Sequence, residues 1–116
     1  TDDPLFIKVG GTDLYIDLGA EKLLLAEKNA HQIAVEIKEF ASPSQLSDFH
    51  TALGQYLNYR LALDQTQPQR GLFLAVSKQV YATFFDITFI RASLKHYSIA
   101  LLVFDPANKE ALKWIN

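Results

Sequence analysis

The order of strand-like and helix-like segments places the strongest restriction on the fold of this 116-residue chain. Apolar and polar residues alternate at 14–18 and again at 33–37, which is the period of a half-buried strand. A further strand is expected at 5–9, because this apolar run ends in a pair of glycines that favour a turn. The stretch 20–28 is rich in Leu, Ala, Glu and Lys, and we expect it to form a short helix.

A long helix is expected to follow these strands. Ser42 suits the N-cap, Pro43 suits the first helical position, and Gln45 completes a capping box with Ser42. Apolar residues then recur at helical spacing through about Leu63. We expect this stripe to face the core, and its members are Leu46, Phe49, Leu53, Leu57 and Leu61.

The second half of the chain continues with alternating element types. The apolar run 71–76 predicts a buried strand, and Ser77 can cap a helical segment that bends near Asp86 and ends near residue 97. Strands are expected at 99–104 and, as a last edge strand, at 110–115. The chain is therefore predicted to be one α/β domain, residues 1–116, with a mixed sheet flanked by helices.

The aromatic residues of the second half are expected to serve the core. Phe84, Phe85 and Phe89 are spaced as on a helix, and in a domain of this size such a group is expected to pack inside. If part of the group is exposed, a protein partner is a better explanation than base stacking, because the nearby cations are dispersed. Trp114 is expected to anchor the last strand.

The composition excludes several classes of protein. Apolar residues make up 49% and charged residues 21% of the chain, as in a globular domain, so disorder is not expected. The absence of cysteine excludes disulfides and thiolate ligands. No apolar run is long enough to span a membrane, and a cytoplasmic protein is expected. The net charge of −2 argues against a pure DNA-binding module, but less strongly against an enzyme with a local basic patch.

Three charged residues could form a chemical site. Alternation places Glu36 and Lys38 on the face of their strand opposite to Val35, and it places Asp17 opposite to its apolar neighbours. If the two strands pair with their apolar faces towards one core, Asp17, Glu36 and Lys38 meet on one side. Two carboxylates can hold Mg²⁺ with positions open to water and phosphate, while an ammonium orients the attacking water.

A simpler interpretation of these residues stays open at this point. Glu and Lys two residues apart are common on half-exposed strands, and an Asp opposite a Lys is an ordinary cross-strand pair. Periodicity alone does not decide between a metal site and a solvated surface.

Two motifs extend the argument by resemblance. Asp17, followed after nineteen residues by Glu36-Ile37-Lys38, resembles the signature of the PD-(D/E)XK nuclease superfamily, with Ile16 in place of the motif's proline. Gln55 and Tyr59, one turn apart on the long helix, are similar to the Gln-x-x-x-Tyr element of some of these nucleases. More specifically, several stretches resemble the cyanobacterial XisH family, factors that control excision of the fdxN DNA element during heterocyst development: 3–11, 16–23, 35–38, 40–44 and 49–60.

The resemblance implies a fold and a site. The fold would be a restriction-endonuclease-like αβββαβ core, whose N-terminal helix is expected to be missing from this chain, since the chain starts at Thr1 and contains no methionine. Asp17, Glu36 and the carbonyl of Ile37 would bind Mg²⁺ or Mn²⁺. Lys38 would handle the attacking water, and Gln55 would support the site from the helix.

Two functions are compatible with this resemblance. The first is metal-dependent hydrolysis of DNA by an endonuclease that acts in element excision, with a homodimer expected by analogy and DNA as the partner. The alternative is a catalytically silent regulatory subunit that binds a partner protein, either an XisI-like factor or the site-specific recombinase. The acidic balance of the chain favours the alternative, whereas the presence of Asp17, Glu36, Lys38 and Gln55 in the required order favours the enzyme.

Overall fold

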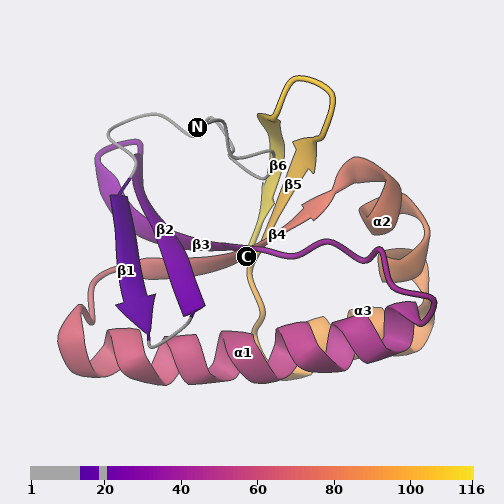
Figure 1. Cartoon of the computed structure of the whole chain (residues 1–116), viewed down its shortest axis with the longest axis horizontal. Coiled ribbons are helices and arrows are strands. Elements are labelled where there is room, and N and C mark those ends of the chain that lie inside the picture. Colours follow the sequence, from indigo (N-terminus) through magenta and orange to yellow (C-terminus); the bar gives the residue numbers. More distant parts are fainter. Residues whose placement is uncertain (1–13, 19–20) are drawn as a thin grey trace.

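The computed structural model describes residues 14–18 and 21–116, with side chains from Leu23 onward. Within these residues the sheet has six strands in the order β1-β2-β3-β4-β5-β6 (Figure 1). The strands are β1 (Leu14–Leu18), β2 (Glu21–Lys28), β3 (His31–Ile37), β4 (Gly71–Ser77), β5 (Leu101–Asp105) and β6 (Glu110–Ile115). The helices are α1 (Gln45–Thr66), α2 (Lys78–Ala82) and α3 (Thr88–His96), and the 3₁₀ turn η1 (Phe84–Asp86) lies between α2 and α3.

The sheet is mixed, as the sequence predicts. β1, β2 and β3 form an antiparallel meander, β3, β4 and β5 are parallel, and β6 is antiparallel to β5. The chain is an α/β domain compatible with a restriction-endonuclease-like core. The strand predicted at 5–9 lies outside the described residues.

The prediction of a helix at 20–28 is wrong, because residues 21–28 form β2. Its Leu, Ala, Glu and Lys residues favour a helix intrinsically, but helix propensity amounts to only a few tenths of a kcal/mol per residue, roughly. β2 pairs with β1 on one side and with β3 on the other. Its apolar residues 23–26 are buried on both faces of the sheet, so tertiary contacts outweigh the local preference.

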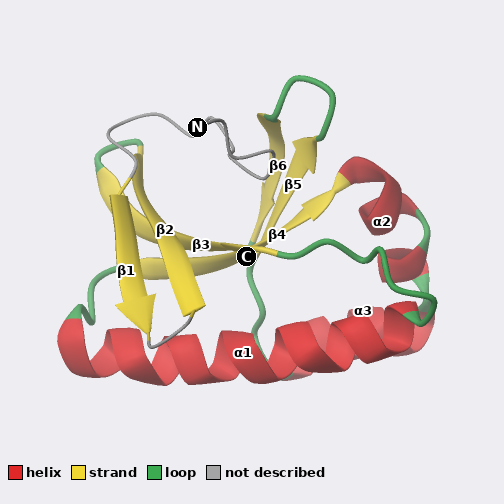
Figure 2. Ribbon diagram, viewed as in Figure 1, coloured by secondary structure: helices red, strands yellow, loops and turns green. Residues whose placement is uncertain are grey.

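Both faces of the sheet are buried, and the helices cover one of them (Figure 2). The helix-covered face joins α1 and η1 to alternate strand residues, among them Leu23, Ala34, Leu74 and Leu101. The opposite face forms a second cluster of strand side chains: Leu24, Ala26, Ile33, Val35, Phe73, Ala75, Leu102 and Phe104. Trp114 of β6 packs on this second cluster with its ring 4.9 Å from that of Phe73, so it anchors the edge strand as predicted.

The long helix begins two residues later than the capping pattern predicts. Ser44, not Ser42, is the N-cap, and its hydroxyl accepts a hydrogen bond from the amide of Ser47 at 3.1 Å. Ser42 instead lies in the preceding turn, where its amide donates to Asp48 Oδ2 at 3.1 Å. A first-turn carboxylate therefore reaches back to the preceding backbone, as the acidic partner of a capping box does.

The leucine stripe predicted to face the core is largely on the outside of α1. Leu46, Leu57 and Leu61 are 49%, 36% and 57% exposed. Phe49 of the predicted stripe is buried, and the other buried residues of α1 are Ala52, Tyr56, Tyr59 and Leu63. Both the predicted stripe and the buried set fit a helical period, so periodicity alone does not decide which face of α1 packs on the sheet. The aromatic face fills the space above the sheet better, because each tyrosine ring offers a large area while its hydroxyl can find a partner.

Truncation of two leucines on α1 tests this orientation. We expect Leu63→Ala, at a site 2% exposed, to lower the free energy of unfolding by about 2–5 kcal/mol, since it leaves a cavity. Leu61→Ala removes the same atoms from an exposed site and is expected to change it by less than about 0.5 kcal/mol. Urea denaturation of both variants measures the difference. Equal losses would contradict the orientation of the helix.

The segment after β4 follows the sequence prediction closely. Ser77 caps α2 and accepts a hydrogen bond from the amide of Val80 at 3.2 Å. Phe84 and Phe85 are buried and pack against Phe40 and Phe49, with ring centroids 5.4–6.0 Å apart. Phe89 is 69% exposed, so its predicted place in the core is wrong.

Candidate functional site

Glu36 is the charged residue that the fold buries most completely among the described side chains. It is 5% exposed and lies in β3, in register with Leu74 of β4. Alternation along β3 places it with Ala34 on the helix-covered face, whereas Val35 belongs to the opposite cluster. A carboxylate is rarely buried to this extent unless it is paired or has a chemical role. The simpler interpretation of Glu36 as a solvated surface charge is therefore excluded.

Lys38 follows Glu36 on the same face. β3 ends at Ile37, but the amide of Lys38 still donates to the carbonyl of Ala75 at 3.0 Å. The parallel ladder thus extends one residue further, and alternation keeps Lys38 on the side of Glu36. The Lys38 side chain is half-buried. A buried carboxylate and a partly desolvated ammonium therefore stand at the carboxyl end of a strand inside the sheet.

The intervening Ile37 has a different environment. Its side chain packs with Ile33 and Val35 on the opposite face. Its carbonyl oxygen, predicted as a further metal ligand, stays a prediction.

α1 brings the predicted helix element over the same face of the sheet. Tyr59 is 5% exposed and belongs to the cluster that contains Ala34 and Leu74, the neighbours of Glu36. Gln55 lies one turn before Tyr59 and is half-buried. Tyr59 thus lies on a face of α1 distinct from that of the exposed Leu57 and Leu61. Tyr59 is thus buried between α1 and the sheet, and the role of Gln55 in supporting the site stays a prediction.

Asp17 is separated from Glu36 by a whole strand. The predicted site requires direct pairing of the strands that carry Asp17 and Glu36, but β2 lies between β1 and β3. In the backbone register Asp17 is opposite Lys22, and Ile16 is opposite Leu23. β1 and β3 are thus two strand spacings apart, about 10 Å. The Asp17 side chain lies outside the described part of the chain, so its role as a ligand stays a prediction.

The predicted ligand atoms are of the type that a hard divalent cation prefers. The predicted ligands are all oxygen atoms, and Mg²⁺ characteristically takes one or two carboxylates and completes its shell with water and phosphate oxygens. Among residues 23–116, no group of three or more His, Cys, Asp or Glu side chains is close enough to hold an ion. Among the described side chains, Glu36 is therefore the candidate carboxylate ligand at this place.

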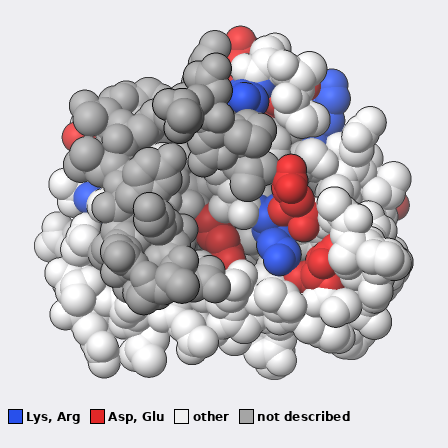
Figure 3. All heavy atoms as spheres, viewed as in Figure 1, with Lys and Arg blue, Asp and Glu red and all other residues white. Residues whose placement is uncertain are grey.

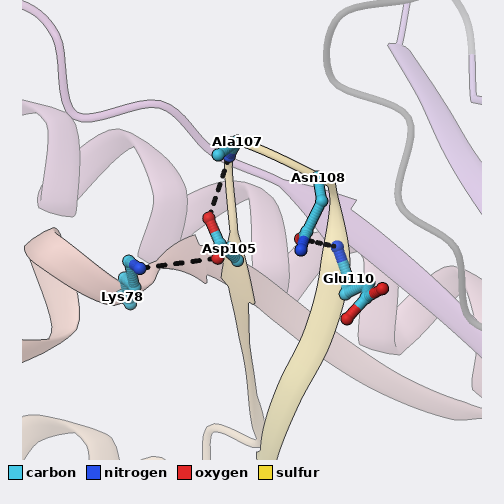
Figure 4. A network of polar contacts seen from close by, with 5 residues as sticks. All are labelled: Lys78, Asp105, Ala107, Asn108 and Glu110. Atoms are coloured by element: carbon cyan, nitrogen blue, oxygen red, sulfur yellow. Dashed lines mark hydrogen bonds and ion pairs between the residues drawn. The ribbon is translucent and has the colours of Figure 1, made fainter.

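A second polar group at the same edge of the sheet is not predicted from the sequence. Lys78 Nζ is 3.4 Å from Asp105 Oδ2, and the other oxygen of Asp105 accepts a hydrogen bond from the amide of Ala107 at 2.9 Å (Figure 4). These residues follow β4 and end β5, so they stand at the carboxyl edge of the parallel strands. The positions of these residues in the sequence could have predicted the group, because polar residues at the ends of neighbouring parallel strands meet at one edge of the sheet.

Charged side chains of both signs gather around the middle of the face in Figure 3, while the lower edge, along α1, displays neither sign. α1 has only Asp48, Arg60 and Asp64 as Asp, Glu, Lys or Arg residues in its 22 positions. The described residues thus present no basic stripe along this helix of the kind that tracks a DNA backbone. In the same part of the chain, no helix has the length and apolarity required to cross a bilayer.

Comparisons with known proteins agree on one family. The family model described as XisH protein matches residues 1–112. A crystal structure of an XisH family protein from Nostoc punctiforme PCC 73102 is 40% identical with a TM-score of 0.79, and the match covers 89% of this chain and 83% of that chain. A fdxN element excision controlling factor protein from Anabaena variabilis is 39% identical with a TM-score of 0.79, and the match covers 100% of this chain and 85% of that chain. No curated protein matches.

The resemblance found in the sequence is therefore confirmed at the level of the family. The family model spans nearly the whole chain, and both structural relatives share the fold at 39–40% identity. This chain belongs to the XisH family.

Proposed function

We propose that this chain is a factor controlling excision of a DNA element, as its Anabaena variabilis relative is named, and that it hydrolyses DNA phosphodiester bonds with a divalent cation. The observation that carries the chemical part is the burial of Glu36 beside Lys38 at the carboxyl end of β3. Burial of an acidic side chain on a central strand is costly for folding. Groups retained at such a cost are candidates for a chemical role.

Each residue has a defined task in this proposal. Glu36 would supply a carboxylate oxygen to the cation, and water and phosphate oxygens would complete its shell. A bound divalent cation neutralises charge that develops on the scissile phosphate. Lys38 donates from its ammonium to the attacking water or to a phosphate oxygen, and its position two residues from Glu36 keeps both groups on one side of the strand. Gln55 acts as a positioning residue from α1.

The proposal is tested by nicking of supercoiled duplex DNA by the full chain. We expect conversion to the open circular form with Mg²⁺ or Mn²⁺ and no conversion with excess EDTA. Because nuclease contamination can mimic this result, the activity must co-elute with the protein and respond to substitution of Glu36. No conversion with either metal over a range of DNA concentrations and salt would contradict hydrolysis.

A second function is favoured by a different observation. Large apolar side chains are exposed on α1 and at the start of α3, namely Leu46, Leu57, Leu61, Ile87 and Phe89. Exposed aromatic and aliphatic groups of this size are typical of protein interfaces. A catalytically silent subunit would use such surfaces to bind an XisI-like factor or a recombinase. Stable co-elution with that partner, unchanged in Glu36→Gln and lost in Phe89→Asp, is the expected behaviour of such a subunit.

A further inference from the structure

A cavity of about 630 Å³ lies under α3, apart from the residues of the proposed metal site. Its apolar wall is formed by α2, η1, α3 and the adjoining strands, through Tyr81, Phe85, Leu94, Ile99, Leu101 and Ile115. Leu101 and Ile115 are paired in register across β5 and β6, so the floor of the cavity is a rigid part of the sheet. Pockets for small molecules commonly have volumes of roughly 300–1,000 Å³ and mainly apolar walls. The cavity therefore has the size and the lining of a ligand site.

The charged side chains that line this cavity are both cations. Arg91 and Lys95 line it from α3, four residues apart and hence on the same face of the helix. None of the described residues that line it is acidic. Lys113, on β6, adds a third cation nearby, with its Nζ 5.4 Å from the ring centre of Tyr81, a wall residue. An apolar ligand with a negative group would match both the wall and the charge.

The two lining cations differ in how firmly they are held. Arg91 forms an ion pair with Asp86, and its Nε donates to the carbonyl of Phe85 at 3.3 Å. These bonds leave further guanidinium donors for a ligand while they fix the group at the edge of the cavity. Lys95 takes part in no ion pair with the other described residues. Its ammonium is therefore available to a carboxylate.

The carbonyl groups at the end of α3 do not prevent an anion from binding in this cavity. A helix C-terminus carries partial negative charge, which would disfavour an anion beside it. Here the Nη2 atom of Arg60 donates to the carbonyls of Tyr97 and Ser98, at 2.9 and 2.8 Å. The guanidinium of α1 thus compensates the negative end of α3 next to the cavity wall at Ser98.

We infer that this cavity binds a small organic acid, with the apolar body of the acid between α3 and the β5–β6 pair and its carboxylate at Arg91 and Lys95. The cavity contains neither Glu36, Lys38 nor Gln55, so the inference does not rest on the proposed hydrolysis. The ligand class follows from charge and shape together. A neutral alcohol of the same length would fill the apolar part but would offer no counter-charge to Lys95.

The test is a titration of the full chain with octanoate and 4-phenylbutyrate, with 1-octanol as the neutral counterpart. Binding is monitored through the NMR chemical shifts of the backbone amides of residues 94–101. We expect at least one acid to bind with shifts confined to the cavity wall, about tenfold or more tighter than the alcohol, because charge-assisted hydrogen bonds are among the stronger ones. Lys95→Gln is expected to weaken binding of that acid about five- to tenfold. Lys109→Gln, the same change of charge in the β5–β6 turn, is expected to leave it unchanged.

Three results would overturn the inference. They are the absence of binding by both acids, equal affinity for acid and alcohol, and equal effects of Lys95→Gln and Lys109→Gln. The last result would mean that the net charge of the chain, rather than a group at the cavity, attracts the acid.

Discussion

Replacing Glu36 by glutamine is expected to lower metal-dependent nicking of duplex DNA about a thousandfold, because the loss of a metal ligand removes several kcal/mol of transition-state stabilisation. Glutamine has the same shape as glutamate and fits the same buried position on β3. The substitution thus removes the charge and one strong oxygen ligand without leaving a cavity. The rate of conversion of supercoiled to open circular DNA, measured over a series of Mg²⁺ concentrations, gives the effect.

The matched control for this prediction is Glu39→Gln. Glu39 is exposed and lies three residues further along the chain, so the substitution makes the same change of net charge near the same strand end. We expect it to retain nicking within about twofold, since exposed charges away from the chemistry contribute little. Equal losses in the two variants would assign the effect to net charge and not to a metal ligand. Full activity of Glu36→Gln would remove Glu36 from the mechanism.

The largest expected effect on stability belongs to Tyr56. This residue is 2% exposed, and its hydroxyl donates to the carbonyl of Leu72 at 2.9 Å and accepts from the amide of Ala100 at 3.1 Å. One side chain of α1 therefore joins the beginning of β4 to the residue that precedes β5. Its ring also lies 5.0 Å from the guanidinium carbon of Arg60, which in turn holds the end of α3.

Two substitutions separate the ring of Tyr56 from its hydroxyl. Tyr56→Ala is expected to lower the free energy of unfolding by about 3–5 kcal/mol, the usual loss when a buried ring is truncated. Tyr56→Phe keeps the ring and is expected to lower it by about 1–3 kcal/mol, because the half-buried amide of Ala100 loses its acceptor. Urea denaturation measures both effects. Tyr97→Phe, at a residue 41% exposed, is the control and is expected to have almost no effect; an equal effect of the two Phe substitutions would contradict the bridging role.

The sequence predicts the later part of the fold well because its signals are local. The apolar run of β4, the cap at Ser77 and the edge strand β6 are each predicted from a few neighbouring residues, and all three are found in the structure. The strand β2 could not be predicted in the same way. Its residues favour a helix locally, and only pairing with β1 and β3 makes it a strand.

The error in β2 explains what the sequence misses in the candidate site. With 20–28 assigned to a helix, the strands of Asp17 and Glu36 are taken as neighbours, but β2 lies between them. The burial of Glu36 is also not predictable from its own strand, because polar alternation normally indicates solvent on that face. Glu36 is buried because α1 covers this face of the sheet. α1 packs there mainly through its tyrosines and not through the predicted leucine stripe.

Binding of Mn²⁺ to the full chain, followed by the decrease of the free-ion signal in electron paramagnetic resonance, tests the central claim most directly. The claim is that the buried carboxylate of Glu36 holds a divalent cation. We expect the unmodified chain and Glu39→Gln to bind Mn²⁺ with similar affinity, and Glu36→Gln to bind it at least about tenfold more weakly, as expected for loss of a carboxylate ligand. Equal binding by all three proteins, or binding by none of them, would contradict the claim.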